Sequence, residues 1–142
     1  MSEARIKILV ADDDPGIQEF YRLALREFFD VVVARDGLEA WKLFESERPR
    51  LVITDLNMPG ENGAILTNRM RNHEELGDTP IIIITGTTRG TDLPPGFWRI
   101  GTQADLFLEK PVTGDELVTE IRRVLLKHQE KHGKSATPRY LE

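Results

Sequence analysis

Cysteine is absent from the 142 residues of the chain. Disulfide bonds and thiolate metal sites are therefore excluded, and the composition is compatible with a reducing compartment. No apolar run approaches the roughly 20 residues that a helix needs to cross a bilayer. The N-terminal residues MSEARIKILV also lack the long apolar segment of a signal peptide. We therefore expect a soluble, cytoplasmic protein without membrane insertion.

An excess of positive charge is also missing. The formal net charge is −5, which argues against direct binding of nucleic acid. The sequence has no glycine-rich loop followed by Lys and Ser or Thr, so a P-loop is excluded. Its three histidines, His73, His128 and His132, do not form a ligand cluster, and no Ser-His-Asp arrangement is visible. At this length we expect one domain with a sizeable core.

Short apolar runs alternate with helical patterns, which predicts βαβ units and a parallel sheet. The five expected strands are Ile6–Ala11, Val31–Val33, Leu51–Thr54, Ile81–Ile84 and Ala104–Leu108. Strict alternation of five strands with five helices gives a doubly wound α/β domain. We expect the flavodoxin-like strand order 2-1-3-4-5.

Capping signals mark the helix starts. Asp14 before Pro15 is typical of an N-cap, while Asp36–Glu39 and Thr113–Glu116 are typical of capping boxes. Helical spacing predicts the core face of the first helix, formed by Ile17, Phe20, Tyr21, Ala24, Leu25 and Phe28. The same spacing predicts core positions on the second and last helices: Trp41, Phe44, Leu117, Ile121, Val124 and Leu125.

The third helix is expected from about Ala64 to His73. After about His128 the sequence turns polar and irregular, which predicts a domain over residues 1–128 and a polar tail, possible linker or truncated end over 129–142.

Polar side chains follow four of the predicted strands: Asp12 and Asp13, Asp55, Thr85 and Lys110. The carboxyl ends of parallel strands meet at one edge of the sheet, and ligands bind there. Three carboxylates held together repel one another unless a cation binds, and oxygen ligands with water suit Mg²⁺. A hydroxyl and a compact ammonium beside them suit a phosphoryl anion. The sequence therefore indicates a magnesium-dependent phosphoryl site.

Asp55 is the candidate nucleophile, because a carboxylate can form an aspartyl phosphate. Alone, it would be interpreted as a cap for the turn before Met58. Asp13 and Asp55 could give direct oxygen ligands to Mg²⁺, with Asp12 acting through water and the Asn57 carbonyl adding a further ligand. Taken singly, Thr85 could equally be a strand-end threonine, Lys110 a solvated lysine and Phe107 a core residue. Asp14 is expected only to cap its helix.

These residues together resemble the receiver domain of two-component response regulators. The matching segments are KILVADDDPGI (Lys7–Ile17), LVITDLNMPGENG (Leu51–Gly63), PIIIITG (Pro80–Gly86) and LFLEKP (Leu106–Pro111). The resemblance covers about residues 6–126 and is highly specific as an ordered set.

The resemblance implies that Asp55 accepts phosphoryl from a histidine kinase or a histidine phosphotransfer protein. It implies Mg²⁺ binding by Asp12, Asp13, Asp55 and the Asn57 carbonyl, and contact of Thr85 and Lys110 with the phosphoryl group. Phe107 would be the aromatic switch residue whose rotamer reports phosphorylation. Such a protein is a signalling phosphoacceptor, not an enzyme, and assists only its own phosphorylation and dephosphorylation. Its signal would pass to a downstream protein partner or a homodimer.

Three departures from the family pattern concern the segment after Thr85. Gly86 stands where receivers more often carry alanine, the gap to Lys110 is a few residues longer, and Pro94-Pro95 falls where the fourth helix should start. Phe97 and Trp98 are adjacent, so at most one can point squarely into the core. We expect residues 87–101 to form a phosphorylation-sensitive partner or self-association surface. The competing interpretation is that both aromatics cover the gap left by a shortened helix.

Rival functions remain at this point. A haloacid-dehalogenase-like phosphatase needs a second aspartate two positions after the nucleophile, where Asn57 stands. A flavodoxin-like cofactor binder needs a phosphate-binding loop after the first strand, where Asp12–Asp14 would repel phosphate. A pseudo-receiver that acts only as a protein-interaction scaffold stays open. The chain is expected to be either a single-domain regulator or the receiver of a longer protein.

Overall fold

The computed structural model describes residues 5–58, 63–86 and 103–132. At its centre is a parallel sheet of five strands in the order β2-β1-β3-β4-β5, which confirms the predicted order. The strands are β1 (Lys7–Ala11), β2 (Asp30–Ala34), β3 (Leu51–Thr54), β4 (Ile81–Thr85) and β5 (Leu106–Glu109). β5 begins two residues later than predicted, and β4 includes Thr85 as its last residue.

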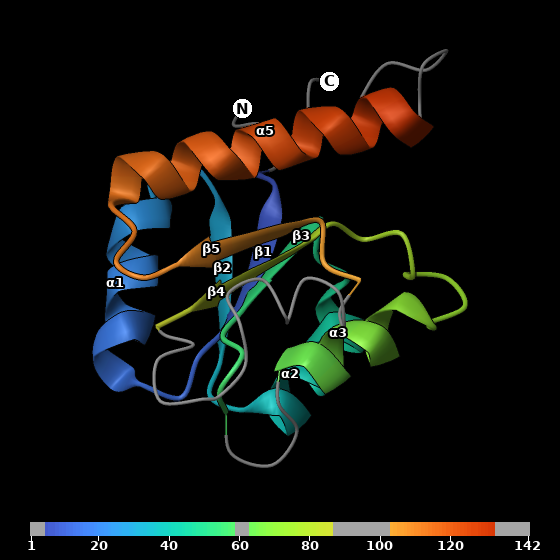
Figure 1. Ribbon diagram of the computed structural model, residues 1–142, viewed down its shortest axis with the longest axis horizontal. Helices are drawn as coiled ribbons and strands as arrows, with labels where there is room; N and C mark the ends of the chain where they lie inside the picture. The colour runs from blue at the N-terminus through green and yellow to red at the C-terminus, as the bar shows by residue number, and fades with distance from the viewer. Residues whose placement is uncertain (1–4, 59–62, 87–102, 133–142) are drawn as a thin grey trace.

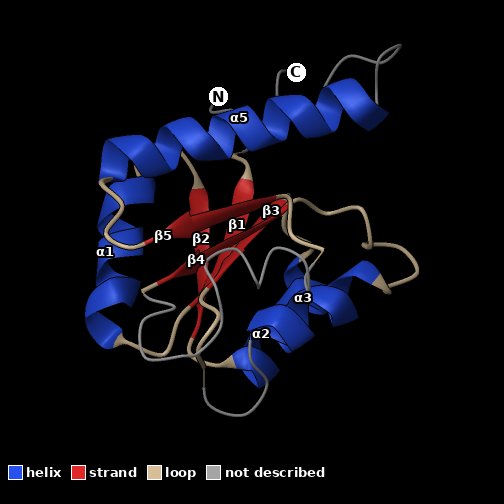
Figure 2. Ribbon diagram, in the orientation of Figure 1, coloured by secondary structure: helices blue, strands red, loops and turns tan. Residues whose placement is uncertain are grey.

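Helices cover both faces of the sheet. Figure 1 shows α1 (Pro15–Leu25) and α5 (Gly114–His132) on one side and α2 (Gly37–Glu47) and α3 (Gly63–Arg71) on the other. The same layers are visible by element type in Figure 2. The expected fourth helix, with Phe97 and Trp98, lies outside the described residues, so the prediction for residues 87–101 stays a prediction. None of the described helices is long and apolar enough to cross a membrane.

Alternation along the buried strands divides the core into two layers. On β1, Ile8 and Val10 join the cluster under α1 and α5, whereas Leu9 and Ala11 join the cluster under α2 and α3. Because both faces are covered, the central strands are continuous apolar runs instead of alternating ones. This burial explains why strands such as Ile81–Ile84 could be located from the sequence.

The first helix begins as predicted but ends sooner. The Asp14 carboxylate accepts hydrogen bonds from the backbone N–H of Gly16 (2.7 Å) and Ile17 (3.3 Å). The prediction that Phe28 belongs to the core face is wrong: its side chain is 44 % exposed, and Phe29 is buried instead. The helix ends at Leu25, so the helical spacing no longer applies to Phe28.

The second and last helices also carry the predicted caps. The Asp36 side chain accepts from the Glu39 N–H (2.8 Å), and the Thr113 hydroxyl accepts from the Glu116 N–H (3.1 Å). The Glu39 carboxylate receives the N–H of Arg35, one residue before the N-cap, so this box is displaced by one position. α5 continues to His132, beyond the helix end expected near His128.

Arg71, at the end of α3, anchors the entrance to β5. Its guanidinium donates to the carbonyls of Gln103 (2.9 Å) and Thr79 (2.5 Å) and pairs with the Asp105 carboxylate (2.5 Å). The same carboxylate accepts the N–H of Ile81, the first residue of β4 (2.8 Å). One side chain thereby fixes the start of the strand that precedes Lys110.

Alanine at position 63 should destabilise the protein, because a Cβ added to Gly63 would lie 2.2 Å from the backbone oxygen of Asp55. The clash involves backbone, so Gly63→Ala should lower the free energy of unfolding by about 1–3 kcal/mol, measured by urea denaturation. Gly86→Ala is the matched control, since its Cβ would meet Lys110 Cδ at an ordinary 3.7 Å. Equal stability of the two variants would contradict this account.

Candidate functional site

The three predicted acidic residues meet at the carboxyl edge of the sheet. Asp12 and Asp13 follow β1, Asp55 follows β3, and the two strands are neighbours with Ala11 opposite Thr54. One carboxylate oxygen from each acid lies within 4.8 Å of the other two. Asp12 and Asp55 are buried, whereas Asp13 is exposed. The donor set is of the hard oxygen kind that Mg²⁺ prefers.

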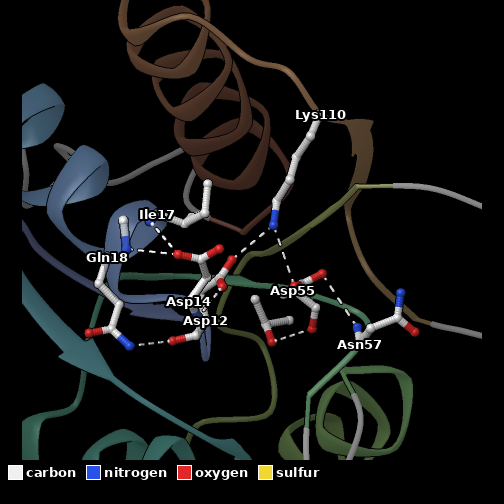
Figure 3. A network of polar contacts seen from close by, with 9 residues as sticks. Asp12, Asp14, Ile17, Gln18, Asp55, Asn57 and Lys110 are labelled. Carbon is white, nitrogen blue, oxygen red and sulfur yellow. Dashed lines mark hydrogen bonds and ion pairs between the residues drawn. The ribbon is translucent and has the colours of Figure 1, made fainter.

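Every polar group of Asp12 makes a hydrogen bond. Its N–H donates to the Ala34 carbonyl (3.1 Å), and one carboxylate oxygen accepts the N–H of Asp14 (2.9 Å). The other carboxylate oxygen accepts from the Lys110 ammonium at 3.0 Å. The Asp12 carbonyl accepts from the side-chain amide of Gln18 at 2.8 Å (Figure 3). Asp12 is therefore a rigid part of the site.

Asp55 lies between the acids and the lysine. Its N–H donates to the Ala11 carbonyl (2.9 Å), which ties the end of β3 to the end of β1. Its carboxylate accepts from Lys110 Nζ at 3.4 Å and from the Asn57 N–H at 3.3 Å, as Figure 3 shows. One acceptor oxygen is thus turned toward the lysine and the other toward the loop after β3.

Charge and burial compete at this pair. Burial raises the pKa of Asp55 above its usual range; Lys110 opposes the shift, and the negative charge of Asp12 adds to it. Burial alone would lower the pKa of Lys110, but its hydrogen bond to Asp12 and the charges of both carboxylates outweigh burial and raise it. The ammonium is therefore firmly charged, while the Asp55 carboxylate is held ionised at some cost.

Thr85 ends β4 fully buried, and its hydroxyl oxygen has no hydrogen-bond partner among the described residues. A buried hydroxyl without a partner costs on the order of 1–3 kcal/mol. The Thr85 carbonyl accepts the N–H of Lys110 at 2.8 Å, so the two residues are adjacent across β4 and β5. The peptide bond from Lys110 to Pro111 is cis. The residue whose backbone pairs with that of Lys110 therefore carries an unused hydroxyl.

Two further residues, Asn57 and Phe107, are predicted to belong to the site. Asn57 is exposed beside Asp55, and Phe107 is half-buried on β5, opposite Ile83 of β4. His73 is not a ligand: its Nδ1 accepts the backbone N–H groups of Glu75 (3.1 Å) and Leu76 (3.0 Å). The acidic trio is the metal-type cluster found in the described part of the chain.

Gln18 is a site residue that sequence reasoning did not identify. It stands on α1, one turn after Asp14, and is 8 % exposed although its neighbours in the pattern are apolar. Tyr21, buried one turn further along, has a pKa raised by burial. A polar residue on the inward face of the first helix, directly after the acidic loop, was the signal that could have indicated a role for Gln18.

Residues 8–122 match the model of the response regulator receiver domain, and the chain belongs to that family. It is 34% identical over 132 residues to the DNA-binding response regulator MtrA of Mycolicibacterium smegmatis, covering 92% of this chain and 55% of that protein. It is 31% identical over 126 residues to response regulator Rre1 of Synechocystis sp., covering 87% of this chain and 53% of that protein. The chain thus spans about half the length of these curated relatives.

Solved structures agree with the fold. Chemotaxis response regulator CheY4 of Vibrio cholerae aligns with a TM-score of 0.76 at 27% identity, over 85% of this chain and 99% of that one. The signal receiver domain of a signal transduction histidine kinase from Syntrophus aciditrophicus aligns with a TM-score of 0.78 at 27% identity, over 92% and 96% of the two chains. The expectation of a receiver with a doubly wound sheet is confirmed.

Asp55→Asn should stabilise the protein at neutral pH in the absence of divalent cations. The pKa of Asp55 is higher in the folded protein than in the unfolded chain, so folding favours the protonated carboxyl. The folded state is therefore more stable at low pH, and it loses this stability as the pH rises through the raised pKa. The asparagine variant has no carboxyl to ionise at this position, so its stability does not fall in this way as the pH rises. Its Tm should exceed that of the unchanged protein at pH 7, and the difference should shrink toward about pH 4. Exposed Asp78→Asn serves as the control, and an equal gain there would contradict the prediction.

Proposed function

We propose that this receiver accepts a phosphoryl group on Asp55 in a magnesium-dependent reaction and acts in two-component signal transduction. One observation carries the proposal: three carboxylates each offer an oxygen within 4.8 Å of the other two, and a lysine lies 3.0 Å from Asp12 and 3.4 Å from Asp55. Family membership supports the same conclusion.

The donor set fits Mg²⁺. Asp13 and Asp55 would supply direct carboxylate oxygens, and the Asn57 carbonyl a backbone oxygen. Asp12, whose carboxylate oxygens accept from the Asp14 N–H and the Lys110 ammonium, would act through bound water. When bound, Mg²⁺ would supply positive charge to the phosphoryl oxygens and offset repulsion among the acids.

The remaining residues have separate tasks in the transfer. An Asp55 carboxylate oxygen attacks phosphorus, the P–N bond of a phosphohistidine breaks, and the imidazole nitrogen keeps the bonding pair. The Lys110 ammonium pairs with a phosphoryl oxygen, and the unpartnered Thr85 hydroxyl donates to another. The product carries about −2 charges where the Asp55 carboxylate carried −1, so phosphorylation adds about −1 charge at one buried point. These residues act on their own domain, so the protein is a phosphoacceptor and not an enzyme with external substrates.

A protein phosphodonor would cover an apolar pocket beside Lys110. The pocket has a volume of about 310 Å³ and is lined by Ile17, Phe20, Tyr21, Ile84, Lys110, Pro111, Val112 and Leu117. A histidine kinase or histidine phosphotransfer protein that presents its phosphohistidine to Asp55 would reach this pocket with an apolar side chain. The signal would then pass to a protein partner or a second copy, with Phe107 as the switch aromatic. With a net charge of −5, the domain itself is not proposed to bind nucleic acid.

Incubation with acetyl phosphate and Mg²⁺ should add the mass of one phosphoryl group, detected by intact-mass spectrometry. Asp55→Asn should remove the adduct, because it removes the nucleophile, and EDTA should suppress it in the unchanged protein. Asp78→Asn, at an exposed carboxylate, should leave it intact. Failure of the unchanged protein to gain mass would favour the pseudo-receiver alternative, and an adduct that persists in Asp55→Asn would identify a different nucleophile.

Ile17→Asp should slow phosphotransfer from a phosphorylated histidine phosphotransfer protein about tenfold, since a charge would enter the apolar pocket at an expected contact. The rate with acetyl phosphate should stay within about twofold, because the small donor does not need the pocket. Leu23→Asp is the matched control: Leu23 lies on the same helix, is 54 % exposed and is not among the lining residues. Equal slowing with both donors would show damage to the site instead of lost docking.

A further inference from the structure

Gln18 has a buried polar side chain that contacts the acidic site. Its amide Nε2 donates to the Asp12 carbonyl at 2.8 Å, and the residue is 8 % exposed. The backbone N–H of Gln18 donates to the Asp14 carbonyl (2.9 Å), so the residue stands in the first turn of α1, which Asp14 caps. The side chain therefore reaches back from the helix to the loop that carries the acids.

The bond to the Asp12 carbonyl restrains Asp13 more than Asp12. Asp12 has three other restraints, on its N–H and both carboxylate oxygens. The Asp13 carboxylate is exposed and makes no hydrogen bond or ion pair with the described residues. The planar peptide that joins the two residues contains the Asp12 carbonyl and the Asp13 nitrogen. Fixing that carbonyl fixes the plane from which the Asp13 side chain projects.

We propose that Gln18 is a positioning residue that holds the Asp12–Asp13 peptide so that the Asp13 carboxylate faces Asp55 across the cation site. Without this bond the peptide can rotate, and the Asp13 oxygen leaves the 4.8 Å cluster for part of the time. The cation then meets two acids held in place instead of three. This inference rests on the proposed function, because it assigns the role of Gln18 to Mg²⁺ binding.

Gln18→Met tests the assignment, since methionine is of similar length and has no donor. Mg²⁺ binding is measured without phosphodonor, by isothermal titration calorimetry and by the Mg²⁺ dependence of Tm. Loss of a partner that orients a ligand should weaken Mg²⁺ binding roughly tenfold or more. With acetyl phosphate, the Mg²⁺ concentration for half-maximal rate should rise by the same factor, while the rate at saturating Mg²⁺ should stay within about twofold. A purely structural glutamine would lower Tm in EDTA without moving the Mg²⁺ midpoint.

Two further variants keep the result interpretable. Gln18→Leu removes the donor with a shorter, neutral side chain, and should weaken Mg²⁺ binding even if Gln18→Met fails to fold. Gln103→Met makes the same chemical change at an exposed position at the amino end of β5, and should bind Mg²⁺ normally. Normal Mg²⁺ binding in a folded Gln18→Met or Gln18→Leu overturns the assignment. Absence of Mg²⁺ binding in the unchanged protein instead overturns the proposed function, and the assignment with it.

Discussion

The ion pair of Lys110 with Asp12 and Asp55 is the interaction on which the rest of the site depends. It joins the end of β5 to the ends of β1 and β3 at distances of 3.0 and 3.4 Å. Three carboxylates and one ammonium leave a formal charge of −2 at the edge of the sheet. The one lysine therefore reduces the repulsion among the acids but does not neutralise their charge. A divalent cation would match the remaining charge, and this is the physical reason for proposing Mg²⁺ at this edge of the sheet.

The site also depends on the register of the parallel sheet. Ala11 lies opposite Thr54 and Thr85 opposite Glu109, so the residues that follow these positions meet at one level. A slip by one residue would turn side chains to the other face and separate the acids from the lysine. The two core layers hold this register, and Arg71 reinforces it by fixing the start of β5. The packing of the two core layers thereby determines the distances between the acids and the lysine, although most of it lies far from them.

Much of this arrangement could be predicted because it follows from periodicity and from the topology of parallel strands. The order of the strands alone predicts one edge of the sheet for five residues: Asp12, Asp13, Asp55, Thr85 and Lys110. Side-chain hydrogen bonds that cross between elements could not be predicted in this way. Gln18 and Arg71 act through bonds to backbone carbonyls, and no spacing rule indicates which carbonyl a flexible side chain will reach. Phe28 was misplaced for a related reason, since the pattern does not show that α1 ends at Leu25.

In the proposed function one half of the site holds the metal and the other holds the phosphoryl group, and the two halves differ in how fully their polar groups make hydrogen bonds. On the metal side, Asp12 has a partner for every polar atom and is held by Gln18, Asp14 and Lys110. On the phosphoryl side, the Thr85 hydroxyl is buried without a partner in the described structure. A phosphoryl oxygen would give that hydroxyl an acceptor, so Thr85 gains more from a new charge than Asp12 does. Because the Thr85 carbonyl accepts the N–H of Lys110, a movement of Thr85 would also move the backbone at the ends of β4 and β5. In the proposed reaction, the group left without a hydrogen-bond partner therefore lies at the end of β4, which is joined to β5 through the backbone bond of Lys110.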